Sequence, residues 1–329
     1  MATTITGTTI DVGPNKLVSD SSGNVTASGV LSDPSGNVRA GRKNLIINGA
    51  MQVNQRGATS GITSGYFVDR FTLSACSASA VLTSSTPTEF PTAISVSATS
   101  GNPIIFQKIE SKSCQGLSGK TVTVSFYAKN ISNATTLYVK LQYAGSADSW
   151  GSSTTISEQN LGSLTSGWVK YTASWTVPAG GLNGLSLGIL CAGTGTFTMG
   201  VTGVQMEVGS VATDFEHRSY GEILADCKRY YQVISASPTF GVDGNKARMS
   251  IAFPVEMRAT PTVSQSAVIT LSNPGVGTVT QSAISFTNIG STKRGGSYQL
   301  GNFSGMTETK IYHFGQSSGA ALLQFSAEL

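Results

Sequence analysis

The residues best suited to chemistry in this chain gather around Trp150. It stands in the loop-like run Ala147–Ser152, between the carboxylates of Asp148 and Glu158. An exposed indole covers the apolar face of a sugar ring, while carboxylates and amides bond the hydroxyl groups. We therefore predict that Trp150 and Asp148, with Tyr143 nearby, bind a carbohydrate, and a role of Trp150 as an anchor of the loop is the alternative.

Hydrolysis of a carbohydrate is the alternative chemistry. A glycosidase needs two carboxylates on either side of the scissile bond, and Asp148 and Glu158 are the nearest approach to such a pair. The sequence has no nucleophile elbow, metalloprotease motif or phosphate-binding loop. His217 and His313 stand in no recognisable pattern with a nucleophile. We expect no catalytic residue and no enzymatic activity, with polysaccharide cleavage as the rival to test.

A second aromatic group lies near the end of the sequence. It consists of Tyr298 and Tyr312, the latter followed by His313. Tyrosines that remain exposed combine an apolar ring with a hydrogen-bonding tip, which suits recognition surfaces. We predict that these side chains form a patch that faces a receptor, and packing inside a domain is the alternative.

The cysteines do not form a metal site or a disulfide framework. They are Cys76, Cys114, Cys191 and Cys227, and no two have the spacing C-x-x-C. The chain has only two histidines, and the sequence contains no motif that would supply the four nitrogen or sulfur ligands of a zinc site. We predict buried thiols, no bound metal and no cofactor.

Composition argues for a β-protein that does not bind nucleic acid. Charged residues are only 12% of the 329, and glycine occurs 38 times. The net charge of +4 is spread thinly, and Lys293–Arg294 is an isolated basic pair. Affinity for nucleic acid rests on many clustered phosphate contacts. We therefore expect no nucleic-acid partner.

The sequence shows no targeting or membrane segment. Met1–Ile5 has neither a basic region nor an apolar stretch of the kind found in signal peptides. No run of about 18 apolar residues exists that would span a bilayer. We expect synthesis in the cytoplasm and no insertion into a membrane.

The elements that must hold these residues are strands. From Thr121 to Ala128 polar and apolar residues alternate, as in a strand with one buried face. Two further inward sets are Leu137, Val139, Leu141 and Tyr143, and Leu185, Leu187, Ile189 and Cys191. Many such strands between Gly, Ser and Asn turns predict an all-β sandwich or jelly roll over residues 44–218.

Residues 235–329 are predicted to form a second, smaller β-sandwich. One set of alternating apolar residues is Met249, Ile251, Phe253, Val255 and Met257, and another is Ala321, Leu323, Phe325, Ala327 and Leu329. The second set predicts a strand that runs to the last residue, which favours a compact tip.

A helix is predicted between the two sandwiches, over residues 219–234. It follows a strand with period two from Val201 to Val208. Ser219 and Glu222 have the spacing of a capping box, which marks the start of a helix. An apolar stripe follows, formed by Ile223, Leu224, Cys227, Tyr231 and Ile234. This stripe suits the seam of a homotrimer, and packing within the chain is the alternative.

Residues 1–43 contain a short repeat. Ser19–Val25 recurs as Ser32–Val38, and both copies carry Gly-Asn, which favours tight turns. The first copy fits the tip of a hairpin between Lys16–Val18 and Val25–Ala27. This polar segment is too small to fold alone. We predict a fibrous anchor that orders against partner proteins, with a flexible tail as the alternative.

The junction between the sandwich and the helix resembles one found in bacteriophage tail fibres and other virion-fibre proteins. There a β-sandwich like a carbohydrate-binding module passes into a helix. The matching residues are Gln205, Glu207, Gly209, Ala212, Thr213, Phe215, Glu216, Arg218, Tyr220, Gly221, Cys227, Arg229, Tyr230 and Tyr231. Asn44–Gly49 is similar to the opening strand of the module, and the whole likeness covers roughly residues 44–232. Met206 and Val208 replace the more usual Leu and Ala.

The resemblance implies a jelly roll and a role in a virion. We expect a homotrimeric tail fibre that attaches to polysaccharide on a bacterial host and contacts other virion proteins through its N-terminal segment. A head fibre or adaptor that contacts only virion proteins is the alternative. Modules of this family sometimes hold a structural Ca²⁺, which the small number of carboxylates in the sandwich disfavours.

Overall fold

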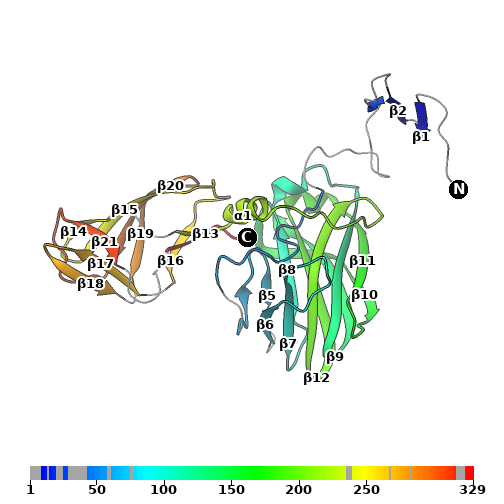
Figure 1. Ribbon diagram of the computed structural model, residues 1–329, viewed down its shortest axis with the longest axis horizontal. Helices are drawn as coiled ribbons and strands as arrows, with labels where there is room; N and C mark the ends of the chain where they lie inside the picture. The colour runs from blue at the N-terminus through cyan, green and yellow to red at the C-terminus, as the bar shows by residue number, and fades with distance from the viewer. Residues whose placement is uncertain are drawn as a thin grey trace.

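The computed structural model describes residues 9–12, 15–19, 25–28, 43–57, 61–74, 78–234, 239–266, 268–281, 284–315 and 323–329. These residues form an all-β fold with one α-helix (Figure 1). A larger sandwich and a smaller β-module lie on either side of that helix. The predicted fold class is confirmed.

The larger sandwich is built on two long strands. Its strands are β4 (Gly65–Tyr66), β5 (Thr72–Ser74), β6 (Ala78–Thr83), β7 (Ala93–Ala98), β8 (Ile104–Ile109), β9 (Thr121–Ser146), β10 (Ser149–Ser163), β11 (Val169–Thr176) and β12 (Leu185–Val208). β9 and β12 pair antiparallel over most of their length. One half of this ribbon is flanked by β10 and β8, and the other half by β11 and β7. β9 and β12 thus serve both layers of a jelly roll.

The predicted inward faces of these strands form the core. Val122, Val124 and Phe126 on β9 are fully buried, as are Leu185 and Cys191 on β12. The alternation of side chains across a strand therefore located the core correctly.

The last part of β12 is buried on both faces, whereas the alternation predicted one exposed face. Gln205 is fully buried, and Glu207 is 4% exposed. The chain after β12 folds back over the outward face: Glu207 accepts hydrogen bonds from Thr213 N and Oγ1, at 2.8 and 2.7 Å, and Gln205 Oε1 accepts one from Glu216 N. The polar residues of the junction thus hold the final strand in place.

The opening segment Asn44–Gly49 is irregular, so the expected strand is wrong. The Asn44 side chain takes over the pairing with β12, because its Oδ1 accepts from Met206 N at 3.0 Å and its Nδ2 donates to Val204 O at 3.2 Å. A main-chain bond from Leu45 N to Met206 O adds to these contacts. The segment is held by side chains rather than by a strand ladder.

The helix begins where the sequence predicts and ends earlier. α1 spans Tyr220–Lys228, and Ser219 and Glu222 form the predicted capping box. Residues from Tyr231 onward form β13 instead, because they pair with the strand that contains Phe325. The predicted helical range 219–234 is thus corrected to a single element of nine residues.

The predicted seam residues pack inside the chain. Ile223 and Cys227 are buried with Ile47 and Val53 of the larger sandwich, and Leu224 packs against the same cluster. The other two seam residues, Tyr231 and Ile234, lie on β13 rather than on the helix. The five residues therefore do not form the predicted helical stripe, and Ile223, Leu224 and Cys227 pack within the chain.

The smaller module has two sheets around its own core. One consists of β13 (Tyr231–Ile234), β22 (Leu323–Ser326) and β16 (Thr262–Gln265). The other runs in the order β18 (Gly277–Gln281), β17 (Ile269–Asn273), β21 (Ile311–Gly315), β14 (Thr239–Asp243), β15 (Lys246–Ala252), β20 (Gly295–Gly301) and β19 (Ser285–Thr292). Met249, Ile251 and Phe325 lie in the core as predicted. Because β13 belongs here, this module begins a few residues before position 235.

The last residues lie at the junction of the modules and not at an outer tip (Figure 1). The Tyr66 hydroxyl donates to the main-chain oxygen of Leu329 at 3.0 Å. The predicted final strand is confirmed for Leu323–Ser326, but it ends there and does not reach Leu329. Positions 321 and 322 lie outside the described residues.

The N-terminal segment contains the predicted hairpin. β1 (Thr9–Val12), β2 (Asn15–Ser19) and β3 (Val25–Ser28) form an antiparallel three-stranded sheet. β2 and β3 enclose the first copy of the repeat, whereas the second copy lies outside the described residues.

A buried cluster of charges joins the two modules. Arg70 is 1% exposed; its guanidinium pairs with the Glu328 carboxylate and lies 3.5 Å from the centre of the Tyr230 ring. Arg56 pairs with the same carboxylate at 3.1 Å and lies over the Tyr231 ring. The arginines belong to the larger sandwich and Glu328 to the smaller module, so this charged joint fixes one against the other.

Asp69 lies beside the charged joint and titrates in a mild pH range. Its carboxylate accepts a hydrogen bond from Gln55 N at 3.1 Å and pairs with Arg56 at 3.2 Å. Burial is the largest influence and raises the pKa of Asp69 to about 6, in spite of these donors. The folded state therefore holds this proton more tightly than the unfolded chain does.

Asp69→Asn is expected to remove this source of pH dependence. In the wild-type protein the contribution of Asp69 to stability is fully present below about pH 4 and is lost as the pH rises through the raised pKa. Over the whole titration, the contribution of Asp69 to the free energy of unfolding falls by about 3 kcal/mol. Urea unfolding followed by tryptophan fluorescence, from pH 4 to 7, measures it as the difference between the two proteins.

The matched control for this prediction is Asp243→Asn. Asp243 is exposed, and the hydrogen bond from Asn245 N lowers its pKa. Its contribution therefore has the opposite sign, being lost as the pH falls below its usual titration range. A constant difference between wild type and Asp69→Asn from pH 4 to 7 would contradict the assignment.

Candidate functional site

One outer face of the larger sandwich is formed by β10, β9, β12, β8 and β5. Along each of these strands, every second side chain points outward onto this face. On β8 these are Ile104, Phe106 and Lys108, which alternate with buried neighbours such as Ile105. The outward residues of β9 and β12 continue the same face.

The strand register places these outward side chains in rows. Lys108, Ser186 and Gln142 form one row across β8, β12 and β9, and Phe106, Gly188 and Lys140 form the next. Gly188 leaves the middle of its row without a side chain. A methyl group there would lie 3.2 Å from Ile104 Cγ2 and from Lys140 Cγ. Because Gly188 has no side chain, the surface of the sheet is recessed at this position.

A cleft of about 290 Å³ opens on this face. It is lined by Ser74, Ile104, Phe106, Lys108, Lys140, Gln142, Trp150, Ser153 and Ser186. Its volume is close to the lower end of the range of small-molecule sites, about 300–1,000 Å³. An aromatic ring on each of two strands and several hydroxyl, amide and ammonium groups therefore surround one concavity.

Trp150 lines the cleft, and it stands on strand β10 rather than in the predicted loop. The register between β10 and β9 shifts between Ser149 and Ser153, and such bulges re-aim side chains. The Nζ of Lys108 lies 5.2 Å from the centre of the Trp150 ring. The indole Nε1 is enclosed and has no hydrogen-bond partner among the described residues. The ring can therefore offer a ligand its apolar surface rather than a hydrogen bond.

Asp148 makes structural contacts and is not among the residues that line the cleft. Its Oδ1 accepts a hydrogen bond from Ser111 N at 2.7 Å, and Arg258 of the smaller module lies 3.8 Å from Oδ2. Its backbone has a φ of 55° at the tip of the β9–β10 hairpin. The carboxylate is committed to a turn and to the junction of the modules.

Tyr143 does not line the cleft either. It follows Leu137, Val139 and Leu141 on the inward side of β9 and packs against the core. Its ring also covers Gly180, where a methyl group would lie 2.4 Å from the Tyr143 Cε2 atom. The face of the strand, rather than the distance along the sequence, separates Tyr143 from Trp150.

The predicted patch of tyrosines in the smaller module is not on the surface. Tyr298 and Tyr312 are both fully buried in the core of that module, with Phe325 packed edge-on against Tyr298. The Tyr312 hydroxyl accepts a hydrogen bond from Thr307 N at 2.7 Å. Only His313 is exposed. These tyrosines stabilise the module and do not face a receptor.

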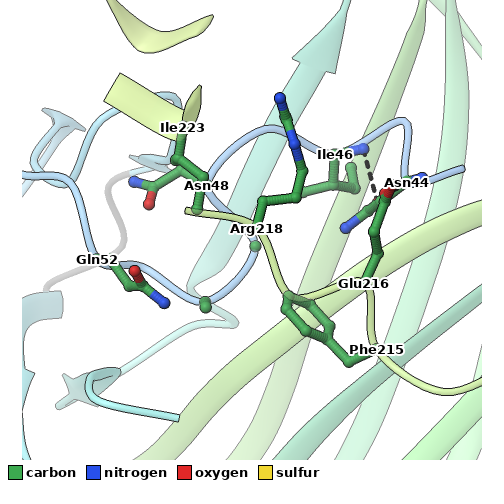
Figure 2. A pocket seen from close by; sticks show the side chains of 10 residues that line it. Asn44, Ile46, Asn48, Gln52, Phe215, Glu216, Arg218 and Ile223 are labelled. Atoms are coloured by element: carbon green, nitrogen blue, oxygen red, sulfur yellow. Dashed lines mark hydrogen bonds between the residues drawn. The ribbon is translucent and has the colours of Figure 1, made fainter. Parts of the chain in front are cut away.

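A second hollow lies between the segments 44–52 and 215–223 (Figure 2). Its volume is about 20 Å³, which is room for about one water molecule. The side chains of Asn48, Gln52 and Arg218 line it together with Glu216, whose Oε2 accepts from Asn44 N at 2.7 Å. It is a packing defect at the start of the module and too small for a sugar.

The described residues contain no group of three or more His, Cys, Asp and Glu side chains that could hold a metal ion. The thiols of Cys114, Cys191 and Cys227 are buried, as predicted, and Cys76 lies outside the described residues. Burial raises the pKa of Cys191 to about 12, which keeps this thiol protonated and unreactive.

No helix in the described part of the chain is both long and apolar enough to cross a bilayer.

Sequence reasoning missed most of the cleft. Phe106, Lys108, Lys140 and Gln142 belong to strands that are far apart in sequence, and only the register of β8, β12 and β9 brings them together. The signal that could have found them was the run of aromatic and polar residues on the outward positions of predicted strands. Trp150 was found because it interrupts a polar, loop-like stretch.

Comparison with known proteins returned structures and no sequence family. No protein-family model matches the chain, and no curated protein sequence does. The active domain of tailspike protein 4 of bacteriophage CBA120 is 15% identical, with a TM-score of 0.36 over 50% of this chain and 21% of that one.

Carbohydrate-binding modules are also among the similar structures. The module-22 and catalytic-module pair of xylanase 10B of Clostridium thermocellum, solved with xylohexaose, is 12% identical, with a TM-score of 0.37 over 53% of this chain and 30% of that one. A family-61 module bound to β-1,4-galactotriose is 11% identical, with a TM-score of 0.33 over 51% of this chain and 100% of its own. The tailspike and the xylanase extend well beyond the matched regions.

Proposed function

We propose that this chain is an attachment protein that binds polysaccharide on the surface of a bacterial host through the cleft around Trp150. The observation that carries the proposal is the cleft itself. Phe106 and Trp150 supply apolar ring surface, while Gln142 and the serines can bond sugar hydroxyls. The sugar class of ligand follows from this mixture of aromatic and hydroxyl-bonding groups.

Binding without cleavage fits the cleft better than hydrolysis. Among the described lining residues none is Asp or Glu, whereas a glycosidase needs two carboxylates at the scissile bond. Asp148 is committed to the turn and to Arg258. Glu158 stands on an exposed position of β10, opposite Lys140. We therefore propose that the chain is not an enzyme.

The setting that we propose is a virion fibre. The resemblance of residues 201–232 to the junction of virion-fibre proteins supports it. Several copies on one particle make a weak single site effective, because linked sites bind with high avidity. We propose a homotrimer whose residues 1–43 contact other virion proteins. Contacts between its subunits must involve residues other than Ile223 and Cys227, since these two are buried within the chain.

An array of bacterial surface polysaccharides probed with the labelled full chain tests this function. Binding to a subset of glycans, together with adsorption to cells that carry them, is the expected result. The appearance of reducing ends during incubation would show that the protein cleaves the polysaccharide. Failure to bind any glycan or cell would favour an adaptor that contacts only virion proteins. Light scattering tests the trimer, and a monomer would refute it for the free protein.

A further inference from the structure

The cleft carries an excess of positive charge. Two lysines line it, Lys108 on β8 and Lys140 on β9, on either side of β12. No Asp or Glu is among the described residues of the lining. Hydroxyl and amide groups can bond the neutral hydroxyls of a sugar, whereas two ammonium groups also attract a negative charge.

The side chain of Lys140 extends into the cleft. The nearest carboxylate in the register is that of Glu158, opposite Lys140 on β10. The stem of Lys140 lies over Gly188 of β12, where its Cγ and Cε lie 3.2 and 3.4 Å from the position of a methyl group on that glycine. In the described part of the chain no ion pair joins Lys140 to an acidic residue. Its charge is therefore available to a ligand.

Lys108 is held at the other side of the cleft. Its Nζ donates to the main-chain oxygen of Leu329 at 2.8 Å and lies 5.2 Å from the centre of the Trp150 ring. An ammonium group has three donors, so it can also reach a ligand. Burial and the positive charge of Arg70 lower the pKa of Lys108, and a bound anion would offset both effects.

We propose that the cleft selects acidic polysaccharides, and that Lys140 and Lys108 bind a carboxylate on a sugar unit that packs against Trp150 and Phe106. This inference rests on the proposed function and adds the class of glycan. Carboxylate-bearing sugars provide both parts that the cleft can recognise. These are a ring with an apolar face and a negative charge near it.

The probes are polygalacturonate, alginate and polysialic acid, each beside its carboxyl-reduced counterpart, in which the same backbone is neutral. Affinity electrophoresis and isothermal titration calorimetry measure binding. We expect at least one acidic polymer to bind about tenfold more tightly than its reduced form, since a hydrogen bond to a charged group contributes roughly that factor. Binding should weaken as salt is raised from low to physiological concentration.

Lys140→Gln and Lys108→Gln locate the effect. Each should weaken binding of the acidic polymer by about tenfold and leave binding of the reduced polymer unchanged. Lys129→Gln is the matched control, because the Nζ of Lys129 lies 4.9 Å from the centre of the Trp168 ring outside the cleft. This control should bind like wild type, and circular dichroism verifies that each variant is folded.

The possible outcomes distinguish a failure of this inference from a failure of the proposed function on which it rests. Equal binding of the acidic and reduced polymers, with no effect of either lysine variant, would overturn the selection of acidic sugars and leave glycan binding intact. Binding to dextran sulfate but to no carboxylated polymer would overturn the assignment of the carboxylate. Absence of binding to every polymer and to the glycan array would overturn the proposed function and this inference together.

Discussion

Trp150→Ala is expected to reduce the affinity for polysaccharide by about thirtyfold. Removal of a large aromatic anchor from the centre of a binding site commonly costs about 2 kcal/mol, and each 1.4 kcal/mol is a factor of ten. The ring lies in the bulge of β10 and lines the cleft. Its loss removes the apolar surface on which a sugar ring would rest. Calorimetry with the tightest-binding glycan measures the effect.

Trp168→Ala is the matched control. Trp168 is also half-buried and also has a lysine over its ring, but it packs over Gly200 on the other layer of the sandwich. We expect this variant to bind like wild type. Equal losses in both variants would mean that the substitutions act through folding. Unchanged affinity in Trp150→Ala would show that the cleft is not the binding site.

Glu328→Ala is expected to destabilise the joint between the modules by about 3–5 kcal/mol, the usual cost of breaking a buried ion pair from one side. The Glu328 carboxylate pairs with Arg70 and Arg56, and the side chains of Arg70 and Glu328 are 1% and 6% exposed. Without it, two guanidinium groups remain close together, one of them fully out of solvent. Scanning calorimetry should show unfolding at a clearly lower temperature.

Glu256→Ala tests whether burial causes this effect. Glu256 also pairs with an arginine, Arg294 at 2.9 Å, but both side chains are more than half exposed. Exposed ion pairs contribute little to stability, so this variant should unfold at nearly the wild-type temperature. If Glu328→Ala and Glu256→Ala unfold like wild type, the charged joint does not hold the modules together.

The charged joint also borders the cleft. Arg70 donates from Nη2 to the Lys108 carbonyl oxygen at 2.6 Å, and the Lys108 ammonium bonds the main-chain oxygen of Leu329. On the hairpin that leads to Trp150, Asp148 is held near Arg258. The smaller module thus supports one end of the cleft, which gives the residues around Asp148 a positioning role in place of the predicted contact with ligand.

Local patterns in the sequence predicted the elements well. Alternation identified the inward faces of β9 and β12, and the capping box identified the start of α1, because both depend on neighbouring residues. The end of the helix could not be read in this way. Tyr231 continues the apolar spacing of a helix, but pairing of β13 with β22 determines its conformation, and those strands are about 90 residues apart in sequence.

The candidate site depended on information that is not local. Trp150 could be found as an aromatic residue in a polar run, whereas Lys108 and Lys140 become neighbours of the cleft only through the register of three strands. Tyr298 and Tyr312 were predicted to lie on the surface, and this prediction was wrong. A tyrosine in a strand fits either a core or a surface, and these two occupy a core.

The crystal structure of the protein with the tightest-binding oligosaccharide from the array tests the central claim most directly. The account predicts a sugar ring in the cleft against Trp150 and Phe106, with its acidic group within hydrogen-bonding distance of Lys140. A sugar bound on the opposite layer, near Trp168 and Lys129, would contradict the account, as would a sugar bound to the smaller module.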